Sequence, residues 1–283
     1  MRACLAGSQP AVFVTVSSRT PALVFTGLAL AGLALWPLRA FVDESGAPSR
    51  DSSEIRPAGL SMARWTSAAI PGGMRALLAD GLWLKVYAAW VARDRPRTEA
   101  LIRWVIMVDD RPTQFWVNGA RIIAYDVTDW RLSAMNGGRV PSEVRRRVFE
   151  EQACAALEHL AAARIRHPDS AAIWVEMGNI NLYRRGDLRR AAECYRRASE
   201  SPDPPYYAAR IHAELLRRLG HDREAYVWLR RLHPTLPNSD EAAMSDVVLR
   251  RIQELERKLK VPEKDRYVPG NLRTKATEST QSD

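Results

Sequence analysis

The feature that most constrains this chain is a short apolar pattern that recurs at nearly constant spacing. A small residue, a large apolar residue four positions on and another apolar residue three positions later occur at Ala191, Tyr195 and Ala198. The same pattern begins 34 residues later at Ala225 and 35 residues earlier at Ala156. Steps of four and three residues place such a set on one face of a helix. A stripe this narrow cannot form a core alone, so each copy predicts a neighbouring helix that covers it.

A fourth copy and two accompanying features extend the pattern toward the N-terminus. This copy lies a further 56 residues back, at Ala100, Trp104 and Met107. A proline follows at the same distance in three copies, at Pro112, Pro168 and Pro237. Small residues occur in the segment before each stripe, at Ala88, Ala120, Gly178 and Ala213. The regular spacing indicates an array of similar units.

The chain between the two ends favours helices throughout. No stretch alternates apolar and polar residues with the period of two that is typical of a strand. Helices are expected over residues 74–93, 98–108, 114–125, 142–166, 171–184, 188–199, 206–218, 223–233 and 240–260. We therefore predict an all-α fold, in which the helices come in pairs.

Together these features resemble the tetratricopeptide repeat, a helix–turn–helix unit of about 34 residues. The best copy, IWVEMGNINLYRRGDLRRAAECYRRA, matches at Trp174, Gly178, Gly186, Ala191, Tyr195 and Ala198, with one extra residue before the turn. The resemblance implies a right-handed solenoid of about four helix pairs over residues 71–260, closed by a capping helix. The copy that contains residues 126–141 is about 22 residues longer than a normal repeat. This insertion either carries a function or merely extends a helix or covers an edge of the array.

The ends of the chain have a different composition. Residues 21–38, PALVFTGLALAGLALWPL, are uncharged and long enough to span a bilayer. We expect a tail at 1–20, a transmembrane anchor at 21–41, a polar linker at 42–70 and a disordered tail at 261–283. A cleaved signal peptide is the alternative to the anchor. The short first tail favours a signal-anchor topology, with the repeat domain outside the cytoplasm. We expect a single-pass protein of the bacterial inner membrane.

The net charge of +9 comes almost entirely from arginine. This excess reflects either biased codon usage or attraction to an acidic partner. The arginines are spread along the helices rather than clustered with glycines and aromatic residues, which disfavours nucleic acid as the partner. We expect another protein or peptide, of acidic character, to bind, and we keep a basic nucleic-acid-binding repeat as the alternative.

No catalytic motif is recognisable in the sequence. Phosphate-binding loops, nucleophile elbows and zinc-protease motifs are missing. The three cysteines have no metal-ligand spacing, and Cys154 and Cys194 are expected to be buried free thiols. The five histidines are scattered, and most of them are expected at the surface or at helix ends. We therefore expect a protein that is not an enzyme and that uses no metal or cofactor; a site built by the insertion is the enzymatic alternative.

The resemblance also implies where a partner would bind. In tetratricopeptide arrays the ligand groove is lined by the first helix of each pair. Projected onto this sequence, the groove residues are Lys85, Arg93, Asn118, Arg121, Tyr125, Asn179, Tyr183, Arg210, Glu214 and Arg217. This set is net basic and contains two tyrosines. It would suit an acidic or extended peptide of a bacterial envelope complex; an ordinary solvated face is the alternative.

Overall fold

A computed structural model describes residues 72–135, 139–237 and 239–269. All regular elements in these three ranges are helices, which confirms the predicted all-α class for them. The predicted tail, anchor and linker at 1–70 lie outside the described residues, as does the segment 270–283. None of the described helices is both long and apolar enough to cross a bilayer.

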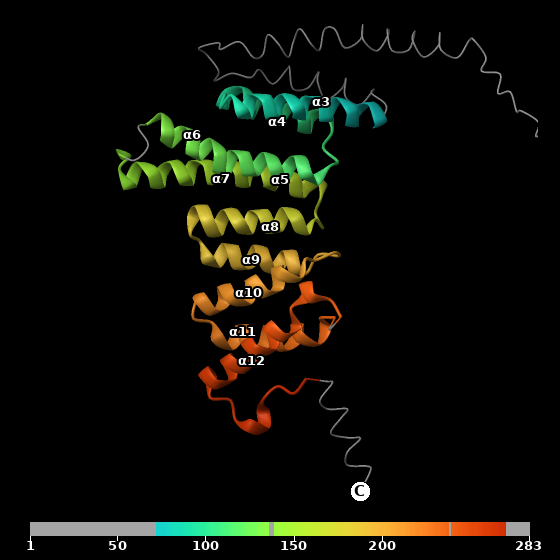
Figure 1. Cartoon of the computed structure of the whole chain (residues 1–283), viewed down its shortest axis with the longest axis vertical. Coiled ribbons are helices and arrows are strands. Elements are labelled where there is room, and N and C mark those ends of the chain that lie inside the picture. Colours follow the sequence, from blue (N-terminus) through green and yellow to red (C-terminus); the bar gives the residue numbers. More distant parts are fainter. Residues whose placement is uncertain (1–71, 136–138, 238, 270–283) are drawn as a thin grey trace, which may run out of the picture. The chain divides into compact units, whose positions relative to one another are not determined.

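Helices that follow one another in the chain lie beside one another (Figure 1). The pairs are α3 (Gly72–Val91) with α4 (Arg95–Val108), α5 (Thr113–Arg121) with α7 (Ser142–Arg166), α8 (Ala171–Ile180) with α9 (Leu188–Ser199), and α10 (Tyr206–Arg218) with α11 (Asp222–Leu232). A last helix, α12 (Ser245–Leu259), packs against α11. Short 3₁₀ turns follow α11 and flank α12, namely η4 (His233–Thr235), η5 (Glu241–Ala243) and η6 (Glu263–Asp265).

The recurring stripe is buried as the spacing predicts. In α9 the side chains of Ala191, Tyr195 and Ala198 are at most 1% exposed. Their cover comes from both neighbouring helices, because the same apolar cluster contains Val175 of α8 and Leu215 of α10. The copies that begin at Ala156 and Ala225 are packed in the same way, although Leu232 is only partly buried.

Small residues allow the closest of these contacts. A Cβ atom added to Gly178 in α8 would lie 3.0 Å from the ring of Tyr195 in α9. Gly119 in α5 is equally crowded, with Ile102 at 2.9 Å and His159 at 3.0 Å from such an atom. These two glycines therefore set how near their helices can approach.

The first helix pair is shifted by one residue from the predicted register. Ala88 was expected at a helix contact but is exposed, whereas Ala89 is buried. In α4 the expected stripe of Ala100, Trp104 and Met107 is half-buried, and the core contains Leu101 and Val105 instead. The α3 helix is apolar on more than one side, so the spacing alone does not select the buried face.

Three of the turns between paired helices contain a left-handed residue. Gly186 has a φ of 67° and Gly220 a φ of 82°. The equivalent position before α4 is occupied by Arg93, with a φ of 54°. The next residue is Asp94 or Asp187 in two of these turns, and its side chain accepts a hydrogen bond from the first turn of the following helix.

The extra residue noted before Gly186 is absorbed by a π-helical turn. This turn, η3 (Asn181–Arg185), continues α8 with hydrogen bonds that span five residues instead of four. The Gly186 N–H accordingly donates to the carbonyl of Asn181. A second π-helical turn, η1 (Ile122–Asp126), continues α5 in the same way.

The predicted insertion extends a helix. Beyond η1 the chain stays helical in α6 (Val127–Ala134), so the helical run that begins at Thr113 ends near the middle of the range 126–141. It lies beside α7, which has 25 residues and is correspondingly long. Residues 136–138 lie outside the described part of the chain.

The predicted boundary at residue 260 was wrong, because the core includes part of the expected disordered tail. Val261 and Tyr267 pack against the apolar cluster of α11 and α12. The backbone N–H of Tyr267 donates to Glu256 Oε1 at 2.6 Å, and the hydroxyl of Tyr226 donates to the same oxygen at 3.0 Å. A buried carboxylate thus fastens this segment to the last helices.

Candidate functional site

Four of the predicted groove residues line one cleft. Arg121 and Tyr125 come from α5 and η1, while Asn179 and Tyr183 come from α8 and η3. The cleft, here called the tyrosine cleft, has a volume of about 380 Å³ and is completed by Asp126 and Glu176. The fold therefore brings together predicted groove residues that are more than 50 positions apart in the sequence.

A buried carboxylate organises the floor of the tyrosine cleft. Glu176 is 1% exposed and accepts hydrogen bonds from Arg121 Nε at 2.9 Å and Asn179 Nδ2 at 3.2 Å. The amide oxygen of Asn179 in turn accepts from the hydroxyl of Tyr195 at 2.5 Å. These bonds link the first helices of two successive pairs to the core tyrosine of the repeat. Each polar side chain is held in one orientation.

Two tyrosines give the cleft its aromatic character. Burial raises the pKa of Tyr125 to about 12, so its phenol stays protonated even in moderately alkaline solution and can donate a hydrogen bond. Tyr183 is 66% exposed and offers its ring to solvent. Burial also raises the pKa of the Asp126 carboxyl at the edge of the cleft.

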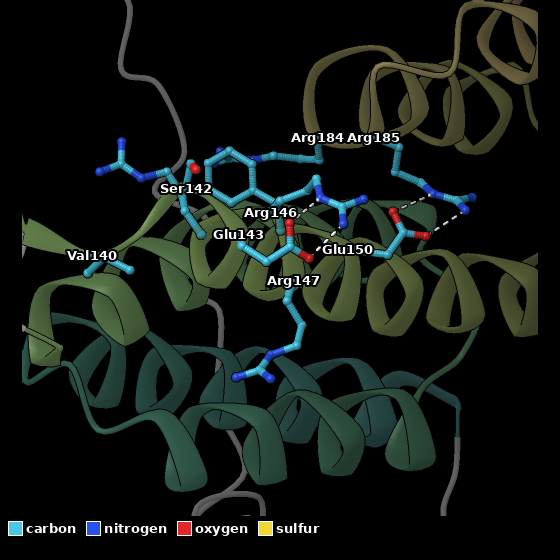
Figure 2. Close-up of a pocket in the computed structure, with 10 residues that line it drawn as sticks. Val140, Ser142, Glu143, Arg146, Arg147, Glu150, Arg184 and Arg185 are labelled. Atoms are coloured by element: carbon cyan, nitrogen blue, oxygen red, sulfur yellow. Dashed lines mark hydrogen bonds and ion pairs between the residues drawn. The ribbon is translucent and has the colours of Figure 1, made fainter.

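A larger cavity of about 630 Å³ lies on the N-terminal half of α7. This helix has 25 residues because it packs along the extended run of α5, η1 and α6. We call it the arginine pocket, because five arginines and two glutamates line it. Figure 2 shows Glu143, Arg146 and Glu150 on one side and Arg184 and Arg185 on the other. Arg146 pairs with Glu143 and Arg185 with Glu150, each at 2.6 Å. The two glutamates are thus already neutralised, so the lining keeps a surplus of positive charge.

Arg184 joins the arginine pocket to the tyrosine cleft. Its guanidinium carbon lies 4.2 Å from the ring centroid of Tyr125 and 5.1 Å from that of Phe149. The first ring lines the tyrosine cleft and the second lines the arginine pocket. Contacts between a guanidinium and aromatic faces are attractive, and they hold the Arg184 side chain between the two cavities.

The other predicted groove residues lie elsewhere. Lys85 on α3 and Asn118 on α5 do not line the cleft, and Arg93 occupies the left-handed turn after α3. Arg210 donates to the carbonyls of Ala242 and Ala243, at 3.0 and 2.7 Å, and so holds η5 in place. Glu214 and Arg217 pair with each other at 3.0 Å on α10. Of the predicted groove residues, the tyrosine cleft thus contains those of the central two pairs.

Sequence reasoning missed Arg184, Phe149 and the arginines of α7. The run RRRVF at 145–149 was an available signal, since it places consecutive basic residues directly before an aromatic one. Among the histidines, His212 is an exception to the expected surface or helix-end position, because it is buried and contacts Trp228. Cys194 is buried as expected, and burial raises its pKa to about 11, whereas Cys154 is only half-buried.

A scan against protein-family models gives no match to this chain, and a comparison with curated protein sequences gives none either.

Proposed function

We propose that this protein is a membrane-anchored tetratricopeptide-repeat scaffold that binds an acidic segment of another protein. The observation that carries the proposal is the connection of the tyrosine cleft to the arginine pocket through Arg184. One surface thereby offers aromatic faces, fixed hydrogen-bonding groups and surplus positive charge. Such a combination suits an extended peptide with acidic and apolar side chains.

The repeat assignment is supported by the arrangement of the helices. Antiparallel pairs follow one another, the stripes of three second helices are buried between neighbours, and glycines occupy two of the inter-helix turns. In an array of this kind each repeat contacts only its neighbours. We infer that the helix pairs form a right-handed solenoid, which is closed by α12 with its charged outer face.

The proposed location follows from the uncharged run at 21–38. This run would anchor the chain in a bacterial inner membrane, with residues 42–70 as a linker and the repeats outside the cytoplasm. The scaffold would then collect a partner within an envelope complex. Washing membranes with alkaline carbonate tests the anchor, because release of the intact chain would contradict it.

Site-specific photo-crosslinking tests the binding surface. A photoreactive phenylalanine analogue replaces Tyr183 in the tyrosine cleft of the full chain, and Tyr207 in a matched control. Tyr207 is 44% exposed at the start of α10 and lines neither cavity. Irradiation of producing cells should give a discrete protein adduct from position 183 and none from position 207.

Charge reversal then tests the role of the arginine pocket. Arg145→Glu should abolish the adduct at position 183, whereas Arg189→Glu on the exposed face of α9 should leave it unchanged. Both variants change the net charge equally, so long-range attraction is matched. Equal loss in both variants, together with a steep dependence on salt, would instead favour the nucleic-acid alternative.

A further inference from the structure

The first helix of the array has a regular apolar face that the described residues leave uncovered. Its large members are Met74, Leu77, Leu84 and Val91, which are 37, 74, 71 and 59% exposed. Gly81 and Ala88 fill the intervening positions and are also exposed. The six positions are spaced by alternating steps of three and four residues. We call this face the outer seam of α3.

The outer seam is distinct from the face that α3 uses within its own chain. The buried residues of the helix are Ala79, Leu82, Val86 and Ala89. At 100° per residue, this set and the outer seam lie on nearly opposite sides of the helix. Space above the outer seam is open, since a Cβ atom added to Gly81 would meet nothing within 4 Å. The helix therefore has two apolar faces and uses only one of them internally.

The opposite end of the array is built differently. In α12 the apolar residues Val248, Ile252 and Leu255 are buried against α11, and the outer positions are mostly charged. A polar outer face is what a terminal helix needs in order to remain in water. The outer seam lacks this property, and large contiguous apolar patches on proteins mark contact surfaces.

The spacing of the outer seam specifies what kind of surface covers it. Apolar residues at alternating steps of three and four form the a and d positions of a coiled coil, so the complementary partner is another helix. We propose that the outer seam packs in parallel against the outer seam of a second copy of this chain. This interface lies outside the tyrosine cleft and the arginine pocket, and it does not depend on their proposed function.

The charges beside the outer seam select the parallel orientation. With Leu77 and Leu84 at d positions, Asp80 occupies a g position and Lys85 the following e position. In a parallel pair the g residue of one helix faces the e residue five positions on in the other, so Asp80 would face Lys85 twice, once on each side. In an antiparallel pair centred on the seam, Asp80 would face Tyr87 and Lys85 would face Leu78. Only the parallel arrangement pairs opposite charges.

Sedimentation of the full chain in a mild nonionic detergent tests the interface. The wild-type chain should form a dimer that dissociates on dilution, because a coiled coil of about three heptads is only marginally stable alone. Leu84→Asp should abolish the dimer. Ile165→Asp is the matched control, since Ile165 is 82% exposed on α7 and lies outside the seam. A wild-type chain that is monomeric at every concentration overturns the proposal, as does a dimer that survives Leu84→Asp.

A charge exchange tests the orientation. Asp80→Lys and Lys85→Asp should each weaken self-association by roughly tenfold, because each places like charges face to face twice. An equimolar mixture of the two variants should associate as tightly as the wild type, since opposite charges meet again in the mixed dimer. If the mixture stays as weak as the single variants, or if neither variant weakens the dimer, the parallel arrangement is wrong.

Discussion

The guanidinium of Arg184 lies 4.2 Å from the ring centroid of Tyr125, and the two residues belong to the two π-helical turns of the described chain. Each turn widens the first helical run of its pair, beside the same cavity. π-Helical turns occur often at functional sites because they redirect side chains that a regular helix would point elsewhere. Here they bring a cation and an aromatic ring from successive pairs into contact.

Replacing Arg184 should therefore cost more stability than replacing a solvated arginine. Arg184→Met keeps much of the aliphatic stem but removes the contact with both rings, and we expect the free energy of unfolding to fall by about 1 kcal/mol. Arg189→Met, on the exposed side of α9, should change it by less than about 0.5 kcal/mol. Urea denaturation of the two variants checks this, and equal midpoints would contradict the bridging role.

The sequence was sufficient for the helices and for most of the buried stripes. The pattern at Ala191, Tyr195 and Ala198 predicts burial because a period near 3.6 residues admits only one inward face. The same spacing argument predicted the wrong buried face for α3 and α4. Apolar residues occur there on more than one face, so the sequence could not show whether Ala88 or Ala89 is buried.

The candidate site was predictable only where the repeat register applies. Projection along first helices found Arg121, Tyr125, Asn179 and Tyr183, but it could not find Arg184, whose direction depends on a π-helical turn. Pairings such as that of Arg185 with Glu150 join residues 35 positions apart on different helices. No local pattern reports a contact of this kind, because it depends on how α7 and η3 pack.

The close packing at Gly178 should reverse the usual effect on stability of replacing a helical glycine by alanine. Replacing glycine by alanine inside a helix normally stabilises it by about 0.5–1 kcal/mol. Gly81→Ala should follow this rule, because its Cβ would meet nothing within 4 Å. Gly178→Ala should lower stability by about 1–3 kcal/mol, because its Cβ would press on the Tyr195 ring. Changes of the same sign in thermal denaturation would contradict the packing of α8 on α9.

The pair of Arg121 and Glu176 should contribute more than an exposed ion pair. The side chain of Arg121 is half-exposed, but that of Glu176 is buried. Arg121→Ala therefore leaves a buried carboxylate whose remaining hydrogen bond in the floor of the cleft comes from Asn179. We expect a loss of about 1–3 kcal/mol in the free energy of unfolding. The exposed pair of Arg146 and Glu143 is the control, for which Arg146→Ala should cost less than about 1 kcal/mol.

A double-mutant cycle isolates this interaction. Glu176→Gln keeps the shape of the side chain and removes its charge, so Arg121→Ala should cost much less in that background. Chemical denaturation of the four proteins gives the coupling energy. A coupling near zero would show that Arg121 does not neutralise Glu176.

The last prediction concerns His159, which α7 places behind α5. Its Nε2 lies 3.1 Å from the carbonyl oxygen of Trp116, and its ring lies 5.0 Å from the Trp116 ring. Burial, together with the nearby charge of Arg103, lowers the pKa of His159 to about 4 from its ordinary 6.5. The neutral ring donates its Nε2 proton to the carbonyl, so the folded state excludes the charged form.

This depressed pKa makes the fold sensitive to acid in a defined window. Between pH 6.5 and about 4 the unfolded chain binds a proton that the folded chain does not, so stability falls as the pH falls through this range. The loss approaches about 3 kcal/mol at the lower end, at 1.36 kcal/mol for each pKa unit. His159→Gln can still donate to Trp116 but cannot titrate, so its stability should fall less between pH 7.5 and 4.5 than that of the wild type. Urea denaturation at several pH values measures the difference, and an equal fall in the two proteins would contradict the role of His159.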